Sequence, residues 1–208
     1  MQQPSSKKRI LVGVLHQGWI RPEMYKTLFE MQTDKRFDVT IYFSNIRPSE
    51  NNRNFLVQKA LEEGYDYLLN IDHDTVPLKN LLDLVGLKKD VIGGAFPAWN
   101  TVDPNYPLYF IAMDRAEDGY REHKEKVGLQ EVDAVGSGGM LLSRAVMEAV
   151  KEPFLRKWKD GFAITGLDFF FCEKAKDLGF KVFCHYDYPC SHYKDLDLLQ
   201  VLKFKQNG

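Results

Sequence analysis

Two aspartates, Asp72 and Asp74, follow directly on the apolar stretch YLLNI (67–71), with His73 between them. Residues two apart in an extended chain point to the same face, so both carboxylates can reach one point beyond the end of the strand, and His73 turns away from it. Two hard oxygen donors suit Mn²⁺ or Mg²⁺, which fill their remaining positions with water and phosphate oxygens. The alternative is that Asp74 or Thr75 only caps a following helix.

A second cluster of metal-binding residue types, Cys184, His185, Cys190 and His192, lies within nine residues. Structural zinc sites usually combine two closely spaced pairs of ligands, whereas this segment has a single C-x5-C spacing and no second pair. A strand here would also send Cys184 and His185 to opposite faces. Zinc is therefore the weaker alternative. With Cys172 the cysteines are odd in number, which favours reduced thiols over a disulfide framework.

The elements that position these residues alternate between strand and helix along the chain. Strands are predicted at 9–15, 37–43, 65–71, 90–96, 131–135 and 181–187, and helices at 21–34, 52–64, 77–89, 143–151 and 167–180. Residues 97–130 look like loops with short strands, and GSGGM (136–140) looks like a tight glycine turn. Near-continuous apolar strands are typical of a sheet covered on both faces. We therefore expect an α/β fold, a three-layer α/β/α sandwich with a mixed, mostly parallel sheet whose ligands bind at the carboxyl ends of the strands.

Composition and charge narrow the possible partners. The 208 residues are 44% hydrophobic, which is enough to bury the core of one domain spanning 1–208. With 28 basic and 29 acidic residues the net charge is −1, so nothing indicates nucleic acid or an anionic membrane as a partner. The amino-terminal apolar run is too short for a signal peptide or a membrane span, and a cytoplasmic protein is expected.

Four segments, in order, resemble the GT-A glycosyltransferases, notably the large inverting family 2. They are ILVGVLHQGWIRPEMYKTL (10–28), NNRNFLVQKALEEGYDYLLNIDHD (51–74) with its D-x-D, VGSGGMLLSRAVMEAV (135–150), and ITGLDFFFCEKAKDLGFKVFCHYDYPCSH (164–192). The resemblance implies a nucleotide-diphospho-sugar transferase fold with a nucleotide-binding half at about 8–96, an acceptor-binding half at about 97–195 and a carboxyl-terminal helix at about 194–206. It further implies transfer of a sugar from a UDP-sugar, UDP-glucose or similar, to an acceptor glycan.

The resemblance also assigns roles to individual residues. Asp72, Asp74 and His192 would hold Mn²⁺ or Mg²⁺, which neutralises the charge that develops on the leaving diphosphate. Asp168, at the start of a predicted helix, would be the general base. Leu167 stands where the family carries another acid. The residues expected to bind the nucleotide sugar are His16, Gln17, Asn45, Arg53, Asp72, His73, Gly138 and Gly139.

Several alternatives stay open on the sequence alone. Arg53 either contacts the diphosphate or lies on the exposed face of its helix. Phe96, Pro97 and Trp99 are candidates for an acceptor platform, although aromatic residues at a strand end are often core. A nucleotidyltransferase is a second function class, but LHQGWIRP (15–22) lacks that class's G-x-G-T-R loop. A non-catalytic nucleotide-sugar-binding module is the third.

Overall fold

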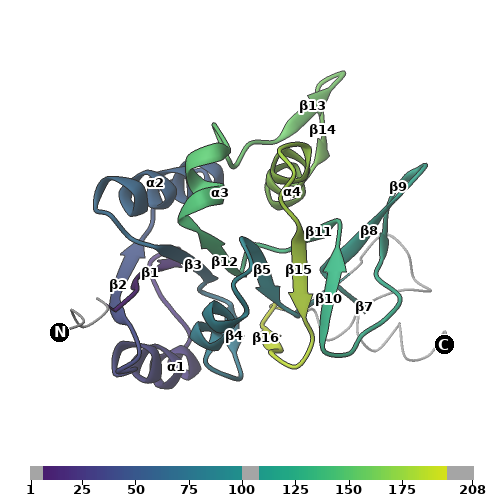
Figure 1. Cartoon of the computed structure of the whole chain (residues 1–208). Helices are drawn as coiled ribbons and strands as arrows, with labels where there is room; N and C mark the ends of the chain where they lie inside the picture. The colour runs from purple at the N-terminus through teal and green to yellow at the C-terminus, as the bar shows by residue number, and fades with distance from the viewer. Residues whose placement is uncertain (1–6, 100–107, 196–208) are drawn as a thin grey trace.

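The computed structural model describes residues 7–99 and 108–195. The helix predicted at about 194–206 lies outside these ranges except for its first two residues. Figure 1 shows a large twisted sheet with helices on both sides. No helix in the described ranges is long and apolar enough to cross a membrane.

Seven strands form the main sheet, in the order β10-β15-β5-β12-β3-β1-β2. Their bounds are Arg9–Leu15 (β1), Asp38–Ser44 (β2), Tyr67–Asp72 (β3), Val91–Gly94 (β5), Leu129–Val132 (β10), Gly139–Ser143 (β12) and Val182–His185 (β15). β1 runs parallel to β2 and β3, and β15 runs parallel to β5. β12 is antiparallel to both β3 and β5, and β10 is antiparallel to β15. The predicted mixed, mostly parallel sheet is confirmed.

Helices cover both faces of this sheet. Their bounds are Pro22–Gln32 (α1), Ser49–Glu62 (α2), Arg144–Ala149 (α3), Leu167–Asp177 (α4) and the 3-10 helix Leu81–Leu87 (η1). The buried side chains of α2, α3 and α4 form one core cluster with one face of the sheet, and those of α1 and η1 form the other. The central strands β1, β3, β5 and β12 are buried from both sides, as their continuous apolar sequences indicate. The predicted three-layer sandwich is therefore confirmed.

The central strand β12 was not predicted. The sequence indicated a glycine turn over 136–140 and a helix from 143, but from Gly139 to Ser143 the chain is a fully buried strand between β3 and β5. A short apolar run covered on both faces has no two-residue alternation, so periodicity does not distinguish it from the first turn of a helix. The glycine turn is confined to the residues before Gly139.

Two further elements differ from the prediction. In place of the helix expected at 77–89 the chain forms the shorter 3-10 helix η1, and the residues before it form strand β4 (Thr75–Pro77). The cap of η1 is the side chain of Asn80, which accepts from Leu82 N. Neither Asp74 nor Thr75 caps a helix, so that alternative is wrong. The strand expected at 131–135 is split at Asp133 into β10 and β11, which belong to different sheets.

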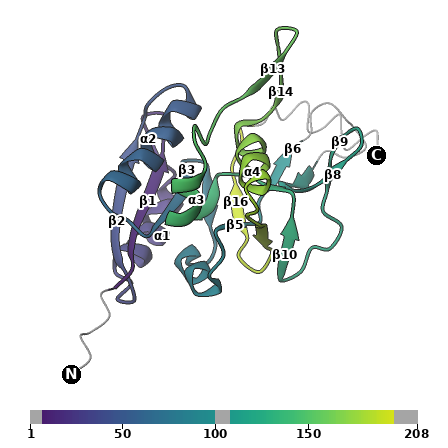
Figure 2. The same ribbon diagram turned by 45° about the horizontal axis from the view of Figure 1, so that its top comes forward.

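The second half of the chain adds small sheets around the main one. They contain β6 (Pro97–Trp99), β7 (Leu108–Phe110), β8 (Ala112–Ala116), β9 (Gly119–Glu122), β11 (Ala134–Val135), β13 (Lys157–Lys159), β14 (Phe162–Thr165) and β16 (Cys190–His192). Figure 2 shows the β13–β14 hairpin projecting from the body beside α4. β16 pairs with β4, with His192 opposite Thr75, and this pairing carries His192 to the end of β3.

Candidate functional site

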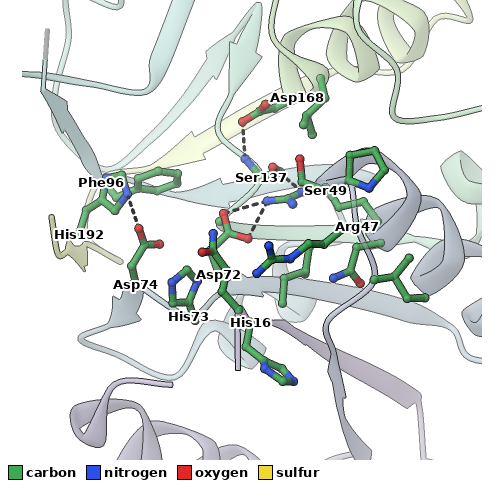
Figure 3. A pocket seen from close by; sticks show the side chains of 18 of the residues that line it. His16, Arg47, Ser49, Asp72, His73, Asp74, Phe96, Ser137, Asp168 and His192 are labelled. Atoms are coloured by element: carbon green, nitrogen blue, oxygen red, sulfur yellow. Dashed lines mark hydrogen bonds and ion pairs between the residues drawn. The ribbon is translucent and has the colours of Figure 1, made fainter. Parts of the chain in front are cut away.

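A pocket of about 680 Å³ opens at the edge of the sheet where β1 and β3 end (Figure 3). The amino-terminal ends of α2 and α4 and the turn before β12 complete its wall. It is lined by residues 15–17, 46–49, 52–53, 72–74, 137–138 and 167–168, together with Phe96, Ile111, His192 and Lys194. This is the edge at which open α/β sheets bind their ligands. The pocket brings together most of the residues that the sequence singled out.

Asp72 is held by a buried arginine. The Nη2 group of Arg53 donates to both carboxylate oxygens of Asp72, at 2.7 and 2.8 Å, and its Nε donates to Ser137 Oγ at 2.7 Å. The Arg53 side chain is only 5% exposed, whereas that of Asp72 is 30% exposed. The prediction that Arg53 could lie on an exposed helix face is wrong. A planar guanidinium fixes a carboxylate more firmly than an ammonium does, so Asp72 has a defined orientation in the pocket.

Gly138 allows the backbone of the turn to pass close to Asp72. A Cβ atom at this position would lie 3.1 Å from Asp72 Oδ2 and 3.0 Å from Thr75 Oγ1, closer than side chains normally approach. Asp72 N also donates to Gly138 O at 3.4 Å. The limited space, and not the backbone angle, therefore favours glycine here, because a larger residue would push the Asp72 or Thr75 side chain aside. Gly139, also predicted to bind the donor, is buried in β12 and does not line the pocket.

Asp74 lies on the other side of the pocket, next to His192 and Lys194. Figure 3 labels Asp74 and His192. Its Oδ2 atom is 3.6 Å from His192 Nε2 and accepts from Lys194 Nζ at 2.7 Å. Burial of Asp74 acts to raise the pKa of its carboxyl, but His192 and Lys194 outweigh it and hold that pKa well below its usual range. Asp74 is therefore a carboxylate at neutral pH.

The orientation of His192 suits a cation ligand. Its Nδ1 lies 2.6 Å from Pro97 O, and since a carbonyl only accepts, Nδ1 carries the proton. A neutral imidazole then presents its Nε2 lone pair toward Asp74, and a protonated one donates toward it. The ring is fixed by an edge-on contact with Phe96, at 5.3 Å between centroids. A backbone carbonyl on one ring nitrogen and a free lone pair on the other is the usual arrangement of a metal-binding histidine.

The side chains of Asp72, Asp74 and His192 are therefore of the types that bind a divalent cation, but they do not converge on one point. The described residues contain no group of three His, Cys, Asp or Glu side chains close enough to hold a metal ion. Asp74 and His192 face each other, while Asp72 faces Arg53 and Ser137. Metal binding by Asp72, Asp74 and His192 stays a prediction. The same finding gives no support to a zinc site at Cys184, whose thiol is buried within the core.

Asp168 lies in the first turn of α4, across the pocket from the D-x-D residues (Figure 3). Its Oδ2 accepts from the backbone N–H of Ser137 at 3.0 Å. Among the described residues, no hydrogen-bond donor contacts its Oδ1. One oxygen is thus anchored and the other is left to accept a proton. The sequence located Asp168 correctly, but its anchoring by Ser137, 31 residues earlier, has no sequence signal.

The remaining predicted residues lie around the mouth of the pocket. His16, Gln17 and His73 line it, and the His73 ring packs edge-on against Trp19 with centroids 5.0 Å apart. Asn45 is exposed and outside the lining, next to Ile46, which does contribute.

The sequence analysis missed several residues that line the pocket. They are Ile46, Arg47, Pro48, Ser49, Asn52, Ile111, Ser137 and Lys194. A signal existed only for residues 46–49, because they directly follow the second strand of a sheet whose ligands bind at that edge.

Comparison with known proteins gives structural matches only. No protein-family model matches the chain, and no curated protein does. A197 from STIV superposes on 90% of this chain and 86% of its own, with a TM-score of 0.61 and 19% identity. GalNAc-T7, in a structure with UDP, GalNAc and Mn²⁺, matches 94% of this chain and 45% of its own, with a TM-score of 0.51 and 12% identity. The chain has a GT-A-like fold. Identities this low establish the fold alone, so the chemistry of a GT-A-like site has to be argued from the pocket itself.

Proposed function

We propose that the chain is a metal-dependent glycosyltransferase that moves a sugar from a UDP-sugar, UDP-glucose or similar, to a hydroxyl of an acceptor glycan with inversion. The observation that carries the proposal is the convergence of Asp72, Asp74, His192 and Asp168 on one pocket at the ligand-binding edge of a GT-A-like sheet. The presence of UDP, GalNAc and Mn²⁺ with the structural neighbour GalNAc-T7 supports it.

Asp74 and His192 would hold Mn²⁺ or Mg²⁺, with Asp72 beside them. A bound divalent cation supplies Lewis-acid stabilisation of the leaving diphosphate. Arg47 adds a further positive charge, since it lines the pocket and forms none of the ion pairs found among the described residues. Its guanidinium is thus available to pair with phosphate oxygens.

Asp168 would accept the proton of the acceptor hydroxyl through its free Oδ1 atom. The acceptor oxygen then bonds to the anomeric carbon, the bond from that carbon to the diphosphate oxygen breaks, and its electron pair leaves with UDP. Attack on the face opposite the leaving group inverts the anomeric configuration. Asp168 lies in the first turn of α4, and the backbone N–H of Ser137 holds one oxygen of its carboxylate.

Isothermal titration with a panel of nucleotide sugars, each with and without Mn²⁺, tests this function. The proposal expects Mn²⁺-dependent binding of at least one UDP-sugar and release of UDP when a glycan acceptor is added. Absence of metal-dependent binding across the panel would refute it. Binding without turnover on any acceptor would favour a binding module, and pyrophosphate release from a nucleoside triphosphate and a sugar 1-phosphate would favour a nucleotidyltransferase.

A further inference from the structure

Asp74 Oδ2 is the point where two other groups of the pocket meet. It accepts a hydrogen bond from Lys194 Nζ at 2.7 Å and faces His192 Nε2 at 3.6 Å. The other oxygen, Oδ1, contacts only the Thr75 hydroxyl, at 3.5 Å, among the described residues. The ammonium of Lys194 is therefore bound to the same oxygen that faces the histidine.

The three groups differ in how freely they can move. The side chains of Asp74 and His192 are 17% and 11% exposed, and the pairing of β16 with β4 fixes both next to each other. Lys194 is 48% exposed and lies two residues after the end of β16. Its flexible stem can carry the ammonium out into solvent without disturbing the strand pair.

A lysine ammonium and a divalent cation cannot share this oxygen. Both are hard cations attracted to the carboxylate, and they would repel each other at a separation of a few ångströms in a partly buried pocket. The ammonium only donates hydrogen bonds, so it cannot replace water or phosphate oxygens around a metal. A metal that binds Oδ2, the oxygen that faces His192, must therefore displace the ammonium.

We propose that Lys194 is the resident cation of Asp74 Oδ2, which a divalent metal has to displace before it binds between that oxygen and His192. The inference rests on the proposed function in that it assumes a metal at Asp74 and His192. Lys194 acts here as a positioning residue: it keeps the Asp74 carboxylate paired and oriented in the free protein and lowers the affinity for the cation.

The test is Mn²⁺ binding without substrate, followed by electron paramagnetic resonance of the free ion, in wild type and Lys194→Met. Methionine keeps the length of the apolar stem and removes the charge. A partly exposed ion pair of ordinary strength between Lys194 and Asp74 lowers the Mn²⁺ affinity of the wild type about fivefold. Lys194→Met is therefore expected to bind Mn²⁺ about five times more tightly than wild type. Lys194→Arg keeps the charge and is expected to stay within about twofold of wild type.

Lys181→Met is the matched control, because Lys181 pairs with Glu131 at 2.7 Å on the outer edge of the sheet, away from the pocket. It is expected to leave the Mn²⁺ affinity unchanged. Equal affinities for wild type and Lys194→Met would overturn the inference, as would failure of Lys194→Met to bind Mn²⁺ at all. UDP-sugar binding at saturating Mn²⁺ is measured on the same proteins. If none of them binds a UDP-sugar while Lys194→Met still binds Mn²⁺ about five times more tightly than wild type, the proposed function is refuted and the inference about Lys194 stands.

Discussion

Replacing Asp72 by asparagine is expected to destabilise the fold much more than the same change at Asp74. Arg53 is 5% exposed, and among the described residues its Nη2 donates only to Asp72, so in Asp72→Asn a largely buried guanidinium loses its counter-ion. Breaking a buried ion pair from one side costs about 3–5 kcal/mol, and the 30% exposure of Asp72 places the expected cost at the lower end, about 3 kcal/mol.

Asp74→Asn removes the partner of a lysine that is 48% exposed and can turn into solvent. The cost expected for this partly exposed pair is about 1 kcal/mol. Urea and thermal unfolding measure both variants: for a chain of this size about 3 kcal/mol lowers the melting temperature by roughly 6–12 °C. Both variants are expected to lose sugar transfer, so activity alone would not distinguish the two carboxylates.

The double variant Arg53→Met/Asp72→Asn is the internal control. Removing the buried charge together with its partner is expected to recover part of the lost stability, because the penalty comes from the unpaired guanidinium. Two results would show that the Arg53–Asp72 pair does not behave as a buried ion pair. One is equal stability of Asp72→Asn and Asp74→Asn. The other is a double variant that is less stable than Asp72→Asn by the full cost of a second deletion.

Three further predictions concern the base, the glycine turn and the thiols. Asp168→Asn is expected to bind UDP-sugar normally but to transfer it about 10²- to 10⁴-fold more slowly by UDP release; unchanged transfer would remove Asp168 from the base role. Gly138→Ala is expected to weaken donor binding in titrations, because its methyl group would crowd Asp72, whereas Gly86→Ala, with nothing within 4 Å, serves as the tolerated control; equal effects would contradict the steric argument. Burial raises the pKa of each of the three cysteine thiols to about 12, so the thiolate form is absent at pH 8 and alkylation is expected only after unfolding; rapid labelling of the folded protein would contradict that burial.

The position of the D-x-D pair was predictable because its signal is local. Asp72 and Asp74 follow an apolar strand, so strand geometry places both at the ligand edge. Asp168 was singled out by the resemblance to the GT-A glycosyltransferases, since its local sequence equally fits an ordinary acid at the start of a helix. The partners of these residues were not predictable. Lys194 is 120 residues from Asp74 in the sequence, and nothing in the local pattern of either segment indicates their contact.

The fold was predicted where periodicity is unambiguous and missed where it is not. Helices α1, α2 and α4 and strands β1 and β3 were placed within a few residues. The run GMLLS was read as a turn and a helix start because a strand buried on both faces looks the same as a short buried helical segment. The position of β12 in the centre of the sheet depends on pairing with β3 and β5, which sequence spacing does not encode.

The central place of β12 also determines how the chain can be divided. β5, which precedes residue 97, has only β12 and β15 as neighbours in the main sheet, and both come from the second half of the chain. A fragment ending at residue 96 would therefore leave β5 with both edges unpaired and would expose one edge of β3. The sheet closes only when β12 inserts between these two strands, so the two halves of the sequence are interleaved in space, and the pocket is complete only after this long-range pairing has formed.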